Sequence, residues 1–121
     1  MGKKKVSFEA FLDGICSVWQ LDAKRRPELL LSGVRYHNRV VGARRNFDAE
    51  QAGHTVEKLV RVPRCDRIAR GNFVTIEGKQ YRIVQVQTIQ DTIPECTDLT
   101  LEASELVADF HQEEAGTSGR I

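Results

Sequence analysis

The chain has few of the residues from which metal, redox and covalent catalytic sites are built. Its cysteines are Cys16, Cys65 and Cys96, and its histidines are His37, His54 and His111. These residues are scattered, and no CxxC pair, GxSxG elbow, P-loop or HExxH motif is present. We therefore expect no catalytic residue, no cofactor and no metal ion. We interpret the three cysteines as small buried or half-buried hydrophobic side chains.

Long hydrophobic runs are also missing. No apolar stretch approaches the ~20 residues that a membrane-spanning helix needs. Three lysines at positions 3–5 open the chain, but Glu9 and Asp13 interrupt the apolar core that a signal peptide would require. With 121 residues, 29% of them charged and 40% hydrophobic, the composition is typical of one globular domain. We expect a protein of cytosolic origin without a membrane partner.

Aromatic residues make up only 7% of the chain, and Trp19 is the single tryptophan. Its position in an alternating segment predicts a core residue, although an exposed anchor at a subunit interface is the alternative. We interpret Tyr36 and Phe47 as core residues as well. No platform of interleaved aromatic and basic residues is visible, so sequence-specific nucleic-acid recognition is not expected.

Charge of one sign is concentrated at each end of the sequence. Residues 1–45 carry ten Lys and Arg against four Asp and Glu, whereas residues 91–121 carry one against eight. This asymmetry favours head-to-tail self-association or a basic face turned to nucleic acid. A solvated basic surface with an acidic flexible tail remains the simpler alternative.

Alternation of apolar and polar residues predicts a mainly β fold. A short glycine turn at Glu77–Lys79 joins two of the expected strands into a hairpin. In the last strand we expect Leu99 and Leu101 to point inward, and Asp98, Thr100 and Glu102 to point outward. The expected strands cover residues 15–21, 34–47 (as one strand or two), 56–62, 73–76, 80–89 and 97–102.

These strands predict a small antiparallel β-barrel, or a curled sheet, of five to seven strands with flexible terminal segments. The barrel domain is expected to span residues 14–103. Residues 1–13 would form an arm, either poorly ordered or a short helix built on Phe8, Phe11 and Leu12. Residues 104–121 would form a tail, disordered or beginning with a short helix through Leu106, Val107 and Phe110.

Basic side chains in two of the predicted strands form a candidate basic face. If the strands pair, these side chains would lie along phosphate groups and bind DNA without sequence preference. The residues are Arg35, Arg39, Lys58 and Arg61.

Two stretches resemble a known family. They are Asp13-Gly14-Ile15-Cys16-Ser17-Val18-Trp19 and residues 67–102, with a Gly-Lys-x-Tyr-Arg-Ile hairpin followed by a Leu-x-Leu strand. The chain resembles the head–tail joining (head-completion or head-closure) proteins of tailed bacteriophages and related prophages. This resemblance implies a small β-barrel with a long loop and no catalytic residues. It places the candidate DNA-channel loop at Arg44, Arg45, Asn46, Asp48, Glu50 and His54.

The resemblance also implies a function. Family members form a ring under the portal, continue the DNA channel, retain the packaged double-stranded DNA and dock the tail. We therefore expect a homo-oligomeric ring that contacts a portal or adaptor protein and a tail-completion or tail-tube protein. It would lie in the virion after assembly and in the host cytoplasm before it. The alternatives are a tail-completion or minor capsid protein, and a small non-specific nucleic-acid-binding barrel.

Overall fold

A computed structural model describes residues 6–40, 53 and 55–104. These residues form eight strands and the segments that join them, and no helix occurs among them. The strands are β1 (Ser7–Phe8), β2 (Gly14–Leu21), β3 (Pro27–Arg39), β4 (Lys58–Pro63), β5 (Phe73–Ile76), β6 (Lys79–Ile89), β7 (Thr92–Ile93) and β8 (Cys96–Ala103).

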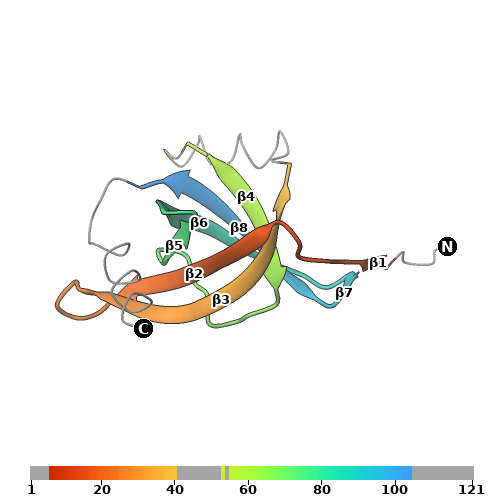
Figure 1. Ribbon diagram of the computed structural model, residues 1–121, viewed down its shortest axis with the longest axis horizontal. Coiled ribbons are helices and arrows are strands. Elements are labelled where there is room, and N and C mark those ends of the chain that lie inside the picture. The colour runs from red at the N-terminus through yellow and green to blue at the C-terminus, as the bar shows by residue number, and fades with distance from the viewer. Residues whose placement is uncertain (1–5, 41–52, 54, 105–121) are drawn as a thin grey trace.

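Six of these strands close into a barrel in the order β2-β3-β4-β8-β6-β5, and every pair is antiparallel (Figure 1). The ring is completed where Ser17–Trp19 of β2 pair with Phe73–Thr75 of β5. Closure removes the open edges that a small sheet would otherwise expose. The predicted small antiparallel barrel is therefore confirmed.

Alternate side chains of the barrel strands point inward and form the main core. On β8 the inward residues are Leu99 and Leu101, as predicted, and on β4 they are Val60 and Val62, all fully buried. Full burial of such a side chain stabilises the fold by about 1.5–3 kcal/mol. The main core contains Cys16, Val18, Tyr36, Val60, Val62, Ile68, Val74, Ile76, Ile83, Leu99 and Leu101.

Extra residues in two strands bend the sheet so that it closes. The pairing of β2 with β3 shifts twice, once between Cys16 and Val18, where Gly33 on β3 has a φ of 68°. The pairing of β6 with β8 shifts between Ile83 and Gln85, so that Ile83 and Val84 are both buried. Such bulges increase local twist and bend a strand, which lets long strands wrap around a small core.

Trp19 lies in a second, smaller cluster with Phe73, on the other side of β2 and β5 from the main core. Its side chain is 1% exposed, and its indole Nε1 donates a hydrogen bond of 3.1 Å to Thr75 Oγ1. The predictions that Trp19 and Tyr36 are core residues are confirmed. Phe47 lies outside the described residues.

The hairpin of β5 and β6 is the most accurately predicted element. Its turn is formed by Glu77 and Gly78, with φ values of 51° and 79°. Positive φ at both central residues of a two-residue turn matches the twist of the flanking strands. Strand β5 has the predicted bounds, and β6 begins one residue before the predicted start.

Two predictions about these strands are wrong. Asp98 and Thr100 of β8 were expected to face solvent, but they are 3% and 0% exposed. Asp98 is covered because the Arg61 guanidinium binds it. The long strand expected from residue 34 begins earlier, at Pro27, and β3 ends at Arg39. The part of that prediction after Val40 falls outside the described residues.

The helix considered for the arm is wrong for the residues that are described. Ser7 and Phe8 form β1, which pairs in parallel with β7, and residues 9–13 run on to the start of β2 without helical structure. We call residues 6–13 the strap. Residues 1–5, and the helix considered for the C-terminal tail after Ser104, lie outside the described residues.

Candidate functional site

The predicted DNA-channel loop cannot be placed against the barrel. Its residues, Arg44, Arg45, Asn46, Asp48, Glu50 and His54, all lie outside the described residues. The loop would connect β3 to β4, because Arg39 ends β3 and Lys58 begins β4.

The structure does not bring the four residues of the candidate basic face together. Arg35 and Arg39 are exposed on β3, and no acidic side chain of the described chain is paired with either. Lys58 is half-buried, and it shares the core-facing side of β4 with Val60 because side chains alternate along a strand. Of the four predicted residues, only Arg35 and Arg39 are therefore exposed.

Arg61 is the clearest correction to the predicted basic face. It is 6% exposed and lies between two carboxylates. Its Nε donates to Asp98 Oδ1 at 2.6 Å, its Nη2 donates to Asp98 Oδ2 at 3.0 Å, and its Nη1 donates to Glu9 Oε2 at 3.0 Å. Hydrogen bonding to Asp98, opposed by burial, raises the pKa of the Arg61 guanidinium. This arginine is occupied within the fold and is not free to bind phosphate.

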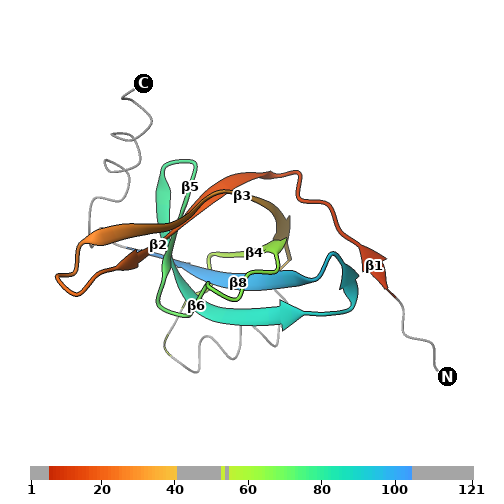
Figure 2. The same ribbon diagram turned by 90° about the horizontal axis from the view of Figure 1, so that it is seen from below.

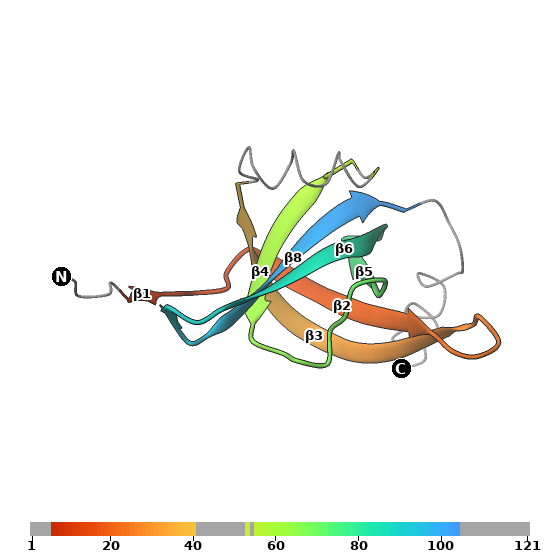
Figure 3. The same ribbon diagram turned by 180° about the vertical axis from the view of Figure 1, so that it is seen from behind.

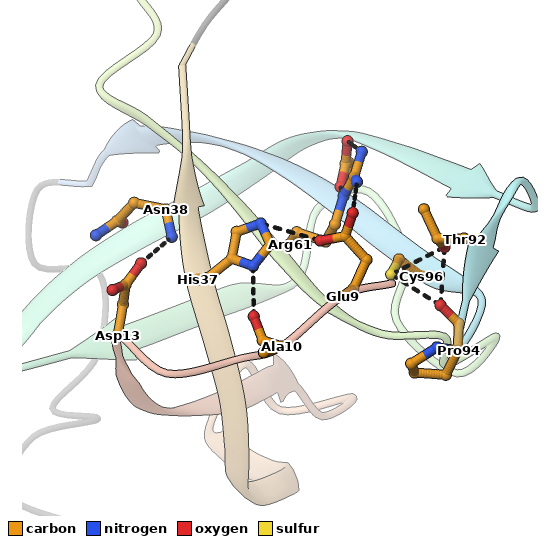
Figure 4. A network of polar contacts seen from close by, with 10 residues as sticks. Glu9, Ala10, Asp13, His37, Asn38, Arg61, Thr92, Pro94 and Cys96 are labelled. Atoms are coloured by element: carbon orange, nitrogen blue, oxygen red, sulfur yellow. Dashed lines mark hydrogen bonds and ion pairs between the residues drawn. The ribbon is translucent and has the colours of Figure 1, made fainter. Parts of the chain in front are cut away.

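The Arg61 network fastens the strap to the barrel (Figure 4). Glu9 of the strap is the connecting residue, because its carboxylate also approaches His37 of β3, with 3.4 Å between Glu9 Oε1 and His37 Nε2. The side chains of Glu9, Arg61 and Asp98 are 10%, 7% and 5% exposed. Removing one of these three side chains would leave a buried charge on a neighbouring side chain without its ion-pair partner.

Further hydrogen bonds hold the strap along its length. His37 Nδ1 lies 2.7 Å from the Ala10 carbonyl oxygen, and since a carbonyl only accepts, Nδ1 carries the proton. The backbone amide of Asn38 donates to Asp13 Oδ2 at 2.7 Å, and the backbone amide of Asp13 donates to the Tyr36 carbonyl oxygen at 3.0 Å. The Phe11 ring stacks on His37 with 5.9 Å between ring centroids. The strap is therefore a defined part of the fold.

Beyond these anchors, β1 and β7 project together from one end of the barrel (Figure 2). The Ser7 amide donates to the Asp91 carbonyl at 3.2 Å, and the Glu9 amide donates to the Ile93 carbonyl at 3.0 Å. Phe8 pairs with Ile93, and they are 80% and 52% exposed. Val6, which directly precedes β1, is also exposed, at 48%. We call Val6, Phe8 and Ile93 the apolar face.

The thiols of the described residues are placed for packing. The Cys16 side chain lies in the main core, and burial raises its pKa to about 12. Burial also raises the pKa of Cys96, whose Sγ lies 3.3 Å from Thr92 Oγ1. Cys65 is half-buried, and all three are free thiols. The prediction that the cysteines act as buried or half-buried hydrophobic residues is confirmed.

Within the described ranges, no group of three or more His, Cys, Asp and Glu side chains is arranged to hold a metal ion. Nor does the described part of the chain contain a helix long and apolar enough to cross a membrane. The features that it does contain are an ion-paired strap and an exposed apolar projection. Sequence reasoning missed both, because Glu9, Arg61 and Asp98 are 37 or more residues apart and no spacing rule connects them.

No family model matches the chain, and no curated protein matches its sequence.

Proposed function

We propose that the chain is a head–tail connector subunit of a tailed bacteriophage or a related prophage. It would form a homo-oligomeric ring between the portal or adaptor protein and the tail-completion or tail-tube protein. The ring would continue the channel for packaged double-stranded DNA, retain that DNA and present a docking surface for the tail. The subunit would lie at the head–tail interface of the virion, and in the host cytoplasm before assembly.

The observation that supports this proposal is the combination of two features. One is the closed barrel, and the other is the projection formed by β1 and β7, which the Arg61 network fastens to that barrel. The stretch that resembles the family, residues 67–102, includes all of β5 and β6 and most of β8, which lie side by side in the barrel. The side chains of Phe8 and Ile93 on this projection are exposed. The six barrel strands, in contrast, are each paired on both sides in the closed barrel. Large exposed apolar side chains on an ordered element are typical of surfaces that bind another protein.

Electron microscopy of purified portal complexes mixed with the chain tests the proposal. An added ring of density on the portal axis is expected, at the end from which DNA leaves the head. In parallel samples, added density on purified tails instead would favour the tail-completion alternative, and added density on purified capsid shells would favour the minor capsid alternative. The absence of added density on the portal would contradict the connector function.

One observation favours the alternative of non-specific nucleic-acid binding: Arg35 and Arg39 are exposed and carry no ion pair to a described acidic residue. That function predicts salt-sensitive binding of duplex DNA by the isolated chain. Binding should weaken when Arg35 and Arg39 are neutralised, and it should be lost when Arg44 and Arg45 are neutralised. The connector function predicts weak binding by the free subunit. Fluorescence anisotropy with labelled duplex DNA, at several salt concentrations, distinguishes the two.

A further inference from the structure

The strap presents one strand edge that no described residue covers. The amides of Ser7 and Glu9 point to β7, and successive residues of a strand turn their backbone groups to opposite sides. The amide and carbonyl of Phe8 therefore point away from β7. Among the described residues, β7 is the only strand that pairs with β1. A free strand edge next to an apolar face can accept another extended segment through main-chain hydrogen bonds.

This edge is held in place before any partner binds. Glu9, the residue after β1, is fixed by Arg61 at 3.0 Å, and the chain on either side of it is hydrogen-bonded to β7 and β3. The two-stranded sheet of β1 and β7 is nevertheless small, and sheets of two strands are marginal alone. A third strand on the free edge would extend the sheet, and its side chains would cover Phe8.

Charge and composition indicate which segment fits. Lys3, Lys4 and Lys5 directly precede the apolar face in the sequence, so a partner strand with acidic residues is favoured. Residues 105–114 read Glu-Leu-Val-Ala-Asp-Phe-His-Gln-Glu-Glu, with four carboxylates and no Lys or Arg. In an extended conformation Leu106, Ala108 and Phe110 share one side of this segment.

The geometry of the barrel favours the segment of a second copy. Strand β8 starts at Cys96, close to β7, and runs away from it, so that Ala103 lies at the end of the barrel opposite the strap (Figures 1 and 3). The apolar face and the end of β8 are therefore at opposite ends of one subunit. Contacts between unlike ends of successive copies close into a ring or extend into a filament.

We propose that residues 105–114 of one subunit add as a strand to the free edge of β1 in the next subunit. Leu106, Ala108 and Phe110 of that strand then lie against Val6, Phe8 and Ile93. This contact rests on the proposed ring, since it supplies the head-to-tail interface that a ring requires.

Disulfide trapping between two full-length variants tests the contact without a portal. One variant carries Phe8→Cys, and the other carries a single cysteine in place of Leu106, Val107, Ala108 or Phe110. The native thiols of Cys16 and Cys96 are buried, and the half-buried Cys65 is replaced by serine in every variant. Leu29→Cys replaces Phe8→Cys in the control, because Leu29 is also exposed, at 46%, but lies on β3.

Mixed dimers should form at least tenfold faster with cysteine at 106, 108 or 110 than with the Leu29→Cys control. Cross-linking at 107 instead of 108 would overturn strand addition, because a helix through Leu106, Val107 and Phe110 would turn residue 107 toward Phe8. Equal rates for Phe8→Cys and Leu29→Cys would also overturn the proposal. So would an intrachain bond in a Phe8→Cys/Phe110→Cys double variant, because the segment would then occupy its own subunit.

A second experiment separates failure of this contact from failure of the proposed function. Alanine at Leu106 and Phe110 should abolish ring formation on the portal, while the Leu29→Ala control forms rings normally. Rings formed equally well by both variants would overturn the contact and leave the connector function standing. If the wild-type chain forms no ring, but the mixed dimers form as expected, the contact stands and the connector function fails.

Discussion

The Arg61 guanidinium on β4 binds the Asp98 carboxylate on β8 through two hydrogen bonds, of 2.6 and 3.0 Å, and both side chains are almost fully buried. The two residues are directly opposite each other in the ladder of β4 and β8. Glu9 binds the same guanidinium from the strap. This arrangement links the barrel wall to the element that carries the exposed apolar face.

Replacing Arg61 should be severely destabilising. Arg61→Met leaves Asp98 and Glu9 buried without their cation, and removal of one partner of a buried ion pair typically costs about 3–5 kcal/mol. Urea denaturation followed by circular dichroism measures the free energy of unfolding. Arg35→Met is the matched control, because Arg35 is exposed, and its effect should stay within about 0.5 kcal/mol. Equal stability of the two variants would contradict a structural role for Arg61.

Weakening the strap should leave the barrel intact. Glu9→Gln removes the charge that binds Arg61, while the size of the side chain is retained. Hydrogen exchange of the Ser7 and Glu9 amides should accelerate at least tenfold, with the amides of Leu99 and Leu101 unchanged. Glu28→Gln, at an exposed residue of β3, is the control and should change neither set. Unchanged exchange at Ser7 would show that Glu9 does not hold the strap.

Stability should fall as the pH rises above about 9. The pKa of Cys16 is about 12 in the folded protein and 9.0 when unperturbed, so the unfolded chain releases its proton first. The stabilisation is fully present below pH 9 and is lost toward pH 12, by about 2 kcal/mol at pH 10.5. Burial also raises the pKa values of Cys96, Tyr36 and Tyr81, which act in the same direction.

The contribution of Cys16 can be isolated by replacement. Denaturation of the wild-type chain and of Cys16→Ala, each at pH 8 and pH 10.5, should show a smaller loss in the variant, by about 2 kcal/mol. A loss of equal size in both proteins would show that the Cys16 thiol is not the group responsible.

Gly14 should not tolerate a side chain. A β-carbon at Gly14 would lie 2.8 Å from Tyr36 Oη and 3.0 Å from two ring carbons of the same buried side chain. Gly14→Ala should therefore cost about 1–3 kcal/mol, as overpacking does. Gly71→Ala is the control for a glycine with positive φ and no neighbour within 4 Å, and it should cost about 1 kcal/mol. Thermal denaturation ranks the two variants, and a smaller effect at Gly14 would contradict this packing.

Alternation predicted the barrel strands because it reports which residues share a face. The hairpin of β5 and β6 was found from Gly78 and the apolar residues around it, and the inward direction of Leu99 and Leu101 was found in the same way. Alternation does not report what covers the other face. Asp98 was therefore expected in solvent, although Arg61 from β4 covers it.

The candidate site was harder to predict for the same reason. The sequence places Arg61 in a basic face because its two acidic partners, Glu9 and Asp98, are distant in the sequence and their contacts with it are not visible there. The strap was considered as a helix because Phe8, Phe11 and Leu12 have helical spacing, but its backbone binds β7 and β3 instead. Contacts between residues distant in the sequence decide whether Arg61 is exposed and whether the strap is helical. Local sequence patterns do not report such contacts.

The most direct test of a connector built on this strap compares three proteins on purified portal complexes by electron microscopy. Wild type and Leu29→Asp should each add a ring of density on the portal axis, whereas Phe8→Asp should add none, because it places a charge in the apolar face. Both substituted side chains are exposed, Phe8 at 80% and Leu29 at 46%, so both variants should fold like the wild type. Portal complexes without added density in the wild-type sample would contradict the account.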